Sequence, residues 1–474
     1  MDFRKLTDEY FDQYIKDLND LVSIESTRDV EHAAPNAPFG PNVAKALETM
    51  LEIGKRDGFE TKNYDGYAGL ITLGDGEESV GILGHLDVVP LGDGWTKNPL
   101  AVTEDQGYLY GRGVLDDKGP FLAGYYAMKM LKDLNVPLKR KVMLIAGTDE
   151  ESGMGGIQEY VKIGPIPTMG FTPDAEFPVI YGEKGNLHIT LDSDQPSIIE
   201  DFQAGTRPNI VIAKADAILK TDQFDEDLYN FFLKTNGLKG KGWVEDGKVH
   251  LYAEGKAAHG SLPYMGINSG VLLLNYIANA YNDKLAGELY ELLKDWKGVP
   301  EGIDVNGVYM GFLTMNPGII TIHDGHAHVL IDIRYPNDTE PEKILKGFEE
   351  ACADFAKDIT PAIAYAGKPL FVDPNSKLVK DLMASYAKYS GDTFSPAITI
   401  GGGTYAKMFD NFVAFGPEKP WVRPPKDVHV GGCHEADEGI SVDALKEAIA
   451  IYADAIVRLA NEWECVAFPG RQNI

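Results

Sequence analysis

The sequence predicts an α/β fold: a mainly parallel mixed sheet with helices on both faces, together with an inserted α+β domain. Three observations predict it. In the first and last parts of the chain, apolar strand-like runs alternate with amphipathic helical patterns, as in parallel sheets whose strands are joined by helices. The middle of the chain lacks this alternation. At 474 residues, the chain is also too long for a single hydrophobic core.

The first part of the chain supplies the elements of this sheet in order. Helices are expected at 7–22 and 42–57, because apolar residues recur at helical spacing on one stripe of each, and Gly58 favours an end to the second. Two strands separated by the turn 74–76 are predicted to pair with each other. The predicted strands are 67–73, 79–84, 141–147 and 169–172, and the further helices are 120–134 and one near Gly156.

A change of pattern after Glu183 divides the chain into three segments. Residues 1–184 and 370–474 are predicted to form one discontinuous domain that ends in a helix at 442–462, and residues 185–369 form the inserted α+β domain. In the insertion, strands are expected at 210–219, 248–254 and 329–334, and helices at 268–281 and 340–357.

Composition and charge restrict the class of protein. A formal net charge of -28 argues against nucleic acid and against an anionic membrane surface as partners, because both are polyanions. The N-terminus lacks the apolar stretch of a signal peptide, and no apolar run approaches the roughly 20 residues that span a bilayer. The cysteines Cys352, Cys433 and Cys465 are too few and too scattered for a disulfide framework or a zinc knuckle. We therefore expect a cytoplasmic protein.

Each apolar strand of the first segment is followed at its carboxyl end by a polar group. His85 ends one strand, Asp116 follows the next apolar run, Glu150 and Glu151 follow the third, and Asp174 follows the fourth. In open parallel sheets, ligands bind in the crevice outside the carboxyl ends of the strands. The sequence therefore predicts that these side chains form one site.

His85 and Asp87 form a pair within this set. They are two residues apart on an extended segment, so their side chains point to the same side. Asp87 can then hold the far nitrogen of an imidazole that binds a metal. The alternative for the pair alone is a histidine that caps a core strand and an aspartate that begins a turn.

The donor set predicts a metal centre. The candidate ligands are His85, Asp116, Glu151, Asp174 and His434. Imidazole and carboxylate donors suit zinc, manganese or cobalt, and the lack of cysteine ligands argues against a closed structural zinc site. Two histidines and three carboxylates exceed the needs of one tetrahedral ion and suit two ions that share a carboxylate. Glu150, next to Glu151, can then face a water molecule as general base.

Eight motifs extend this interpretation, and through them the chain resembles the M20 family of dinuclear metallopeptidases, most closely its dipeptidase V branch. The motifs occur in family order over nearly the whole chain. They lie at 84–90, 111–119, 147–151, 173–176, 257–261, 334–336, 401–405 and 433–438.

The resemblance implies a role for each candidate ligand. His85, Asp116 and Asp174 would hold one ion, and Asp116, Glu151 and His434 the other. Asp116 rather than Asp117 would be the shared ligand, with a cis peptide bond between the two. Two divalent ions per chain are implied, with Zn²⁺ as the first expectation and Mn²⁺ or Co²⁺ as alternatives. Asp87 would orient His85, and Glu150 would serve as base and proton shuttle.

The resemblance also makes the inserted domain a lid on a catalytic domain. His259 would donate a hydrogen bond to the developing oxyanion, and Arg334 would bind the C-terminal carboxylate of the substrate. Asn209 and the backbone of Gly402 and Gly403 would complete that pocket. One chain would supply the whole site, so a monomer is expected. The plain alternatives are a loop without a role for His259 and a surface ion pair for Arg334.

Three further features could suggest other chemistry but favour a structural interpretation, and one loop departs from the pattern of the branch. Residues 401–403 lack the lysine and hydroxyl residue of a nucleotide-binding loop. The histidine-rich stretch 323–328 could bind metal, but its Asp324-Gly325 pair favours a hairpin turn. Cys433 has no activating partner, so it is interpreted as a packing residue. The loop 417–427 is longer than is usual for the branch and is expected near the mouth of the site.

The resulting functional prediction is a metal-dependent dipeptidase. A metal-bridging hydroxide, with Glu150 as general base, would attack dipeptides that have a free N-terminus. The alternative within the family is an amidohydrolase of N-acyl amino acids or succinyl-diaminopimelate. An alternative of another class is a catalytically silent binding protein, which would require a broken ligand set or a lost base.

Overall fold

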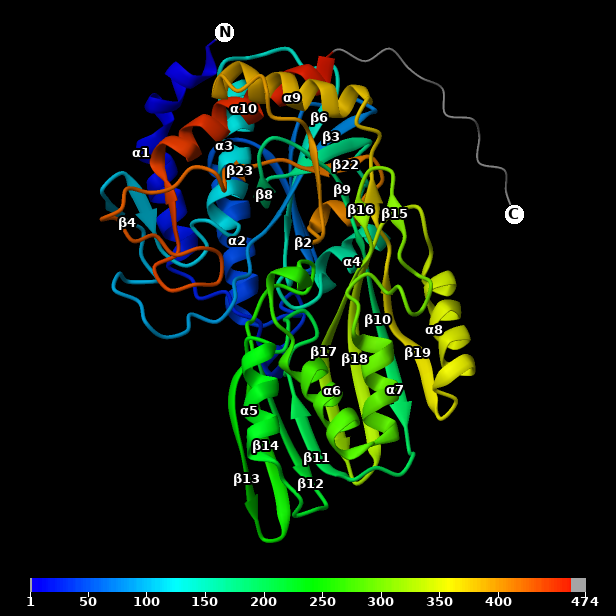
Figure 1. Ribbon diagram of the computed structural model, residues 1–474. Coiled ribbons are helices and arrows are strands. Elements are labelled where there is room, and N and C mark those ends of the chain that lie inside the picture. The colour runs from blue at the N-terminus through cyan, green and yellow to red at the C-terminus, as the bar shows by residue number, and fades with distance from the viewer. Residues whose placement is uncertain (1, 462–474) are drawn as a thin grey trace. The chain divides into compact units, whose positions relative to one another are not determined.

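The computed structural model describes residues 2–461 and divides into two compact units (Figure 1). Of these residues, unit 1 takes 2–181, 372–398 and 404–461, and unit 2 takes 182–371 and 399–403. The segment 399–403 thus clusters with unit 2, whereas the sequence analysis assigned it to the discontinuous domain. Glu462, the predicted last residue of the final helix, and Cys465 lie outside the described residues.

The main sheet of unit 1 is mixed and has parallel strands at its centre. Its order is β1-β2-β6-β3-β7-β22-β9. The bounds are β1 (Glu60–Tyr64), β2 (Ala68–Leu73), β6 (Lys141–Gly147), β3 (Ser79–His85), β7 (Met169–Thr172), β22 (Phe412–Ala414) and β9 (Ile180–Glu183). The strands β6, β3, β7 and β22 run parallel, while β1, β2 and β9 are antiparallel to their neighbours. The predicted α/β class with a mixed sheet is confirmed.

The predicted pairing of the two strands around the turn 74–76 is wrong. β6 lies between β2 and β3, antiparallel to the first and parallel to the second. The turn residues suggested a hairpin, but β3 is buried along its whole length and apolar from Val80 to Leu83. Such a strand is stabilised by neighbours on both edges, and β6 and β7 supply them.

Helices cover both faces of this sheet. On one face, Gly124 of α3 (Lys118–Asp133) packs against Ile82 of β3, and Gly54 of α2 (Pro41–Arg56) packs against Ile71 of β2. On the other face, Tyr405 of η3 packs against Gly147 of β6. The helices of unit 1 are α1 (Phe3–Val22), η1 (Val30–His32), α2 (Pro41–Arg56), α3 (Lys118–Asp133), α4 (Gly155–Ile163), α9 (Lys377–Ser390), η3 (Tyr405–Met408) and α10 (Val442–Asn461).

Helix α3 is the central helix of unit 1. It packs on β3 and β6 and against α1 and α10, as the ribbon view also shows (Figure 1). Its residues 118–128 are all buried. A helix covered on all sides needs apolar residues around its whole circumference, which explains its weak amphipathic pattern. The start of this helix is therefore fixed firmly beneath the carboxyl end of β3.

Short strands complete unit 1 and the boundary with unit 2. They are β4 (Thr103–Asp105), β5 (Tyr108–Tyr110), β24 (Gly439–Ser441), β8 (Ala175–Glu176), β23 (Pro417–Glu418), β20 (Leu370–Phe371) and β21 (Ile398–Ile400). Three of them form a separate small sheet in the order β24-β5-β4, and β23 pairs in parallel with β8. β20 and β21 pair with β9.

Unit 2 is built on one antiparallel sheet in the order β13-β14-β12-β11-β17-β18-β10-β19. The strands are β10 (Gly185–Ser193), β11 (Ile199–Ala204), β12 (Lys214–Leu219), β13 (Lys239–Glu245), β14 (Lys248–Glu254), β17 (Thr314–His323), β18 (His326–Tyr335) and β19 (Ile359–Gly367). The helices are α5 (Glu226–Thr235), η2 (Pro263–Met265), α6 (Ser269–Tyr281), α7 (Lys284–Leu293) and α8 (Pro341–Phe355). A short hairpin of β15 (Asn306–Gly307) and β16 (Gly311–Phe312) is separate from the sheet. Runs of strands and helices of this kind fit the predicted α+β type.

The histidine-rich stretch of unit 2 is a hairpin, as predicted. β17 and β18 are joined at Asp324 and Gly325, whose φ angles are 48° and 90°. Positive φ at both central residues is typical of a two-residue hairpin turn. The side chains of His326 and His328 pair with Asp194 and Asp192, at 2.6 and 2.7 Å.

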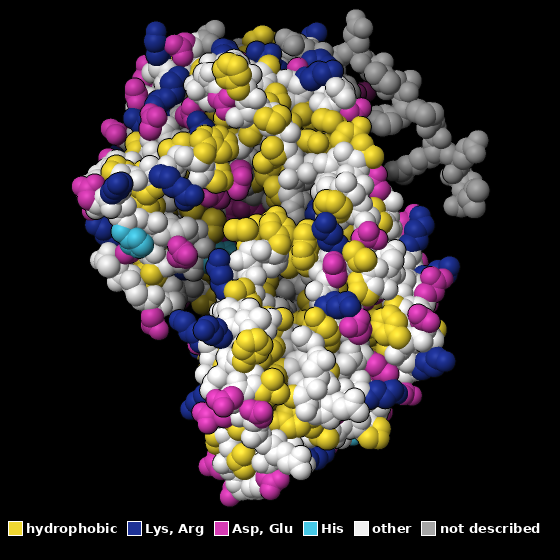
Figure 2. All heavy atoms as spheres, viewed as in Figure 1, with side chains coloured by type: hydrophobic (Ala, Val, Ile, Leu, Met, Phe, Trp, Pro, Cys, Tyr) yellow, Lys and Arg dark blue, Asp and Glu magenta, His cyan; other side chains and the backbone are white. Residues whose placement is uncertain are grey.

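The surface of the described chain is rich in charge. On the face shown in Figure 2, acidic and basic side chains are interspersed and hydrophobic side chains gather in patches. Among residues 2–461, no helix has both the length and the apolar character needed to cross a bilayer.

Candidate metal centre

The candidate centre lies at the carboxyl end of β3. Along the chain, β3 leads through α3 to β6 on one side, and β6 leads through α4 to β7 on the other side of β3. Such a reversal of strand order opens a crevice beyond the strand ends. His85 ends β3, Glu150 and Glu151 follow β6, and Asp174 follows β7. The sequence thus brings three of the four predicted strand ends to one crevice.

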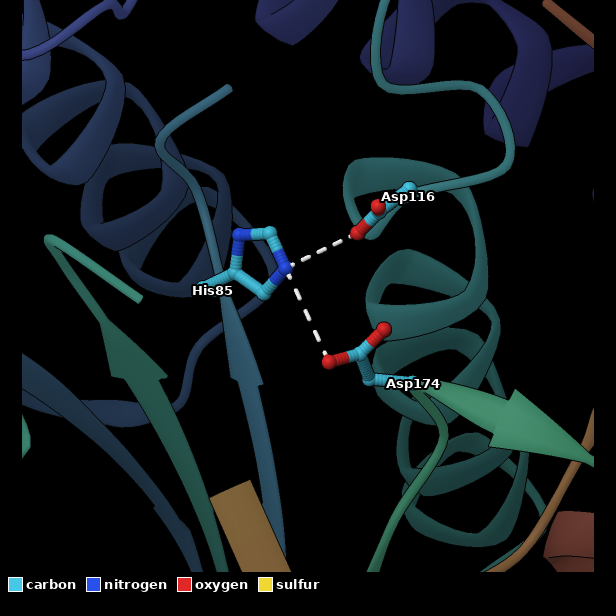
Figure 3. A group of neighbouring side chains, drawn as sticks. All are labelled: His85, Asp116 and Asp174. Carbon is cyan, nitrogen blue, oxygen red and sulfur yellow. Dashed lines mark hydrogen bonds and ion pairs between the residues drawn. The ribbon is translucent and has the colours of Figure 1, made fainter. Parts of the chain in front are cut away.

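The first group of ligands is His85, Asp116 and Asp174 (Figure 3). The Nε2 atom of His85 lies 3.0 Å from Asp116 Oδ1 and 3.8 Å from Asp174 Oδ2. On the other side of the ring, Nδ1 lies 3.0 Å from the carbonyl oxygen of Asp87. Because a carbonyl oxygen only accepts, Nδ1 carries the proton and donates it. Nε2 therefore keeps its lone pair for a metal ion.

Asp87 acts differently from the prediction. Its backbone carbonyl, rather than its carboxylate, makes the close contact with His85, whose Nδ1 lies 3.6 Å from Asp87 Oδ1. The carboxylate accepts from the backbone N–H groups of Glu150 and Glu151, at 3.1 and 3.2 Å. Asp87 thus positions the His85 ring with one group and the Glu150–Glu151 turn with another.

The second group is Asp116, Glu151 and His434. His434 Nε2 lies 3.0 Å from Asp116 Oδ2 and 3.1 Å from Glu151 Oε2. Asp116 therefore turns one carboxylate oxygen to each group, Oδ1 to His85 and Oδ2 to His434. This is the arrangement of a carboxylate that bridges two ions.

Asp116 reaches the centre by a route that the sequence analysis did not predict. The strand before it, β5, belongs to the small separate sheet rather than to the main one. Asp116 lies instead in the turn that begins α3, and its peptide bond to Asp117 is cis, as expected. The buried Asp117 accepts from the backbone N–H of His85 at 3.2 Å, which leaves Asp116 to face the ligands.

Glu438 holds this turn in place, a role that sequence reasoning missed. Its Oε1 accepts from the backbone N–H groups of Gly113, Leu115 and Asp116, at 2.9, 3.0 and 3.2 Å. Its Oε2 accepts from Arg112 Nη1 at 2.5 Å, and both side chains are buried. The only sequence signal was indirect, since Arg112 and Glu438 each lie in one of the quoted motifs.

The electrostatics of the centre fit bound cations. Removal from water raises the pKa of Glu150 well above its usual range, and it raises the pKa of Asp174 to about 7, with repulsion from Asp116 as the next cause. Four carboxylates, of Asp116, Glu150, Glu151 and Asp174, converge here with two imidazoles. Their negative charge exceeds what the imidazoles can balance, so the donor set suits two divalent ions.

The loop 417–427 begins beside this centre, as expected. β23 pairs with β8 directly after Asp174, and Glu418 is close enough to Asp174 to raise its pKa. Cys433 Sγ lies 3.6 Å from Glu418 Oε1. Removal from water and the charge of Glu418 raise the pKa of Cys433, which disfavours a thiolate nucleophile. The side chain of Cys433 is exposed, so its predicted packing role is not confirmed.

The predicted substrate residues form a separate cluster in unit 2. Arg334 is buried; its Nε donates to Asp332 Oδ1 at 2.9 Å and its Nη2 to Asp332 Oδ2 at 3.0 Å. Its Nη1 donates to the carbonyl oxygen of Gly401 at 3.3 Å. The alternative of a surface ion pair is therefore wrong, because the Arg334–Asp332 pair is internal. Gly402 and Gly403 follow directly in the same segment.

His259 and Asn209 belong to the same cluster. The carbonyl oxygen of Asn209 accepts from the N–H of Gly260 at 2.7 Å, and Gly260 packs against Asp332. His259 Nδ1 accepts from the Ser261 N–H at 3.2 Å and lies 2.7 Å from Ser261 Oγ. Its Nε2 therefore carries the proton of the neutral ring. Partial removal from water and the charge of Arg334 lower the pKa of His259, which favours that neutral form.

A family model and two relatives match most of this chain. Residues 81–458 match the description "Peptidase family M20/M25/M40". A protein of Bacillus subtilis (strain 168) named "Putative dipeptidase YtjP" is 37% identical to this chain over 461 residues. The match covers 94% of this chain and 97% of that protein. A protein of Staphylococcus epidermidis with the same provisional description is 38% identical over 472 residues, covering 96% and 98%.

Solved structures share the fold at low sequence identity. Human carnosine dipeptidase 1 superposes with a TM-score of 0.57 at 16% identity, covering 97% of this chain and 98% of that chain. The aminoacylhistidine dipeptidase of Vibrio alginolyticus gives a TM-score of 0.55 at 15% identity, covering 95% and 96%.

Proposed function

Because the chain belongs to the peptidase family M20/M25/M40, and is thus a peptide hydrolase, we propose that it is a metal-dependent dipeptidase acting on dipeptides with a free N-terminus. One observation carries the proposal. The carboxylate of Asp116 presents one oxygen to each of two ligand groups, His85 with Asp174 and His434 with Glu151. Two ions held in this way, Zn²⁺ first and Mn²⁺ or Co²⁺ as alternatives, would supply Lewis acidity and lower the pKa of water.

Glu150 is the proposed general base. The backbone N–H of Glu150 is held by the Asp87 carboxylate, which fixes the start of its side chain beside the ligands. From this position its carboxylate, ionised beside bound cations, would take a proton from attacking water and pass it to the leaving amine.

Residues of unit 2 are proposed to act on the substrate. His259, with its proton on Nε2, is a hydrogen-bond donor for the oxyanion that develops as the carbonyl is attacked. Arg334 is proposed to bind the C-terminal carboxylate. Asp332 accepts from Nε and Nη2 and Gly401 accepts from Nη1, so one further N–H on each of Nη1 and Nη2 is left for the substrate. Asn209, Gly402 and Gly403 are proposed to complete this carboxylate pocket.

The experiment is a comparison of substrates and metals. Hydrolysis of free dipeptides is measured against N-acetyl and N-succinyl amino acids and succinyl-diaminopimelate, after chelation and after return of Zn²⁺ or Mn²⁺. We expect metal-dependent cleavage of the free dipeptides and a loss of about 10²–10⁴-fold in kcat for Glu150→Gln. Glu159→Gln, in the same unit on α4, is the control and should keep full activity.

The other outcomes each favour a different function. Preference for the acylated substrates would retain the metal centre and make the chain an amidohydrolase of N-acyl amino acids or succinyl-diaminopimelate. Two bound ions without turnover of either set would favour a binding protein. The cytoplasmic location and the monomeric state remain predictions, which fractionation and light scattering would test.

A further inference from the structure

A cavity of about 560 Å³ lies wholly within unit 2. Its walls are mainly large apolar side chains, among them Tyr264, Trp296, Met310 and Phe312. Ligand pockets that enclose a small molecule have roughly 300–1,000 Å³ and walls of this kind. None of these four residues has a role in the proposed chemistry.

The cavity adjoins the proposed carboxylate-binding residues around Arg334. Gly401 and Ser261 both line it. The carbonyl oxygen of Gly401 accepts from Arg334 Nη1 at 3.3 Å, and Ser261 Oγ lies 2.7 Å from His259 Nδ1. Gly401 and Ser261 also pack on each other, since a Cβ at Gly401 would lie 2.8 Å from Ser261 Cβ. The cavity therefore shares a wall with both Arg334 and His259.

The aromatic walls are held in position by backbone contacts. The carbonyl oxygen of Trp296 accepts from the N–H of Met315 on β17 at 2.7 Å. The carbonyl oxygen of Phe312 accepts from Nζ of the buried Lys184. Met315 adjoins Thr314, which lines the cavity and is the ladder partner of Arg334. The same pair of strands thus places the aromatic wall and the arginine.

The ring arrangement leaves apolar surface uncovered. The rings of Tyr264 and Trp296 lie with their centroids 5.0 Å apart, and those of Trp296 and Phe312 lie 6.5 Å apart. Tyr264 is 53% exposed and Phe312 is 40% exposed, although both line a concave site. An apolar group that enters the cavity would remove this surface from water, and the burial of apolar area would favour binding.

Positive charge borders the same walls. Nζ of Lys297 lies 4.1 Å from the Phe312 ring centroid and 5.1 Å from that of Trp296. Lys184 lines the cavity, and its Nζ donates to the carbonyl oxygen of Phe312. A cationic occupant would be repelled by these two amines. Apolar and aromatic occupants meet no such penalty.

We propose that this cavity receives the side chain of the C-terminal residue of the dipeptide and selects large apolar or aromatic residues there. This inference rests on the proposed function. In a dipeptide, the C-terminal side chain and the carboxylate leave the same Cα atom. A carboxylate bound by Arg334 therefore brings that side chain close to Gly401 and Ser261, which line the cavity.

The test is a series of dipeptides Ala-Xaa with Gly, Ala, Leu, Phe, Trp and Lys at Xaa. We expect kcat/KM for Ala-Phe and Ala-Leu to exceed that for Ala-Gly by about 10–200-fold, and Ala-Lys to be poor. Phe312→Ala and Trp296→Ala should remove most of the preference for Phe, so that kcat/KM falls much more for Ala-Phe than for Ala-Ala. Trp243→Ala, an exposed tryptophan elsewhere in unit 2, is the matched control and should leave the whole series unchanged.

A binding measurement separates failure of the pocket from failure of the proposed function. Calorimetry with L-phenylalanine and L-alanine measures recognition of a carboxylate with a large or a small side chain, whether or not any dipeptide is cleaved. Tighter binding of phenylalanine, lost in Phe312→Ala, supports the pocket even if dipeptides are not substrates. Equal binding of the two amino acids, equal rates along the series, or an equal loss on all substrates in both variants would overturn it.

Discussion

At the scale of single residues, the ligand set depends on hydrogen bonds to the backbone. His85 presents Nε2 because Nδ1 donates to the carbonyl of Asp87, and Asp116 faces the ligands because Asp117 is tied to the N–H of His85. In unit 2, the N–H of Ser261 places the proton of His259 on Nε2 in the same way. Neighbouring peptide groups thus set the tautomers and orientations on which the proposed roles of these side chains depend.

Glu438 is expected to stabilise the turn that carries Asp116. Glu438→Gln removes the charge that balances buried Arg112 and weakens the bonds to three N–H groups of the Asp116 turn. We expect the free energy of unfolding to fall by about 3–5 kcal/mol, because an uncompensated buried charge is left behind. Denaturant titration followed by circular dichroism measures it.

Two further variants control this experiment. Glu104→Gln, at an exposed position of β4, should leave the free energy of unfolding within about 0.5 kcal/mol of wild type. The double variant Arg112→Gln/Glu438→Gln should lower the free energy of unfolding by less than the sum of the losses in Arg112→Gln and Glu438→Gln, because the two side chains are coupled. Additive losses would mean that the pair contributes nothing as a pair.

At the scale of elements, the beginning of α3 determines where the shared ligand lies. The helix is buried against β3, β6 and α10, and the turn before it carries Asp116. Gly119, in the first turn, lies against the carbonyl oxygen of Val114, and a Cβ there would be 2.1 Å from that oxygen. No side chain fits without a shift of the turn that holds Asp116.

Gly119→Ala is therefore expected to lower the free energy of unfolding by about 1–3 kcal/mol and to weaken metal binding, since the 114–116 turn must move. Thermal unfolding and metal titration measure the two effects. Gly287→Ala in α7 is the matched control: its nearest neighbour, Ala278 Cβ, is 3.7 Å away, so alanine fits and should stabilise by about 0.5–1 kcal/mol. A Gly119→Ala protein that binds metal normally would contradict this account of the turn.

At the scale of the whole molecule, we expect the two compact units to depend differently on cations. The ligand groups lie in unit 1, where four carboxylates converge, while unit 2 rests on an antiparallel sheet and its own hydrophobic core. A cation that binds only the folded state stabilises it by mass action, and it also relieves the repulsion among these carboxylates.

Metal removal should therefore destabilise unit 1 more than unit 2. With metal at 100 times its dissociation constant, we expect a stabilisation of about 2.7 kcal/mol that is lost on chelation. Hydrogen exchange followed by mass spectrometry measures it separately in β3 and α3 and in β17 and β18, so that unit 2 serves as internal control. Equal loss of protection in both units, or none in either, would contradict the assignment of the ions to these ligands.

The sequence by itself determined the fold class and the residues of the candidate metal centre, which the structure brings together. Apolar strand patterns are local, and β6, β7 and β14 were predicted with the bounds that the structure has. His85, Glu151 and Asp174 could be placed together because parallel strands end at one edge of a sheet, a rule that needs no tertiary information. The hairpin at Asp324 and Gly325 likewise follows from the conformations those two residues favour.

Tertiary structure decided what depends on contacts distant in sequence. The insertion of β6 between β2 and β3, the route of Asp116 through the α3 turn, and the bonds of Glu438 to residues 113–116 join segments that no local pattern links. The cavity of unit 2 is of the same kind: Trp296, Phe312 and Gly401 converge only when the β17–β18 ladder and the 399–403 segment are in place. Local patterns specify elements and residue types, whereas the free energy of packing chooses which distant residues meet.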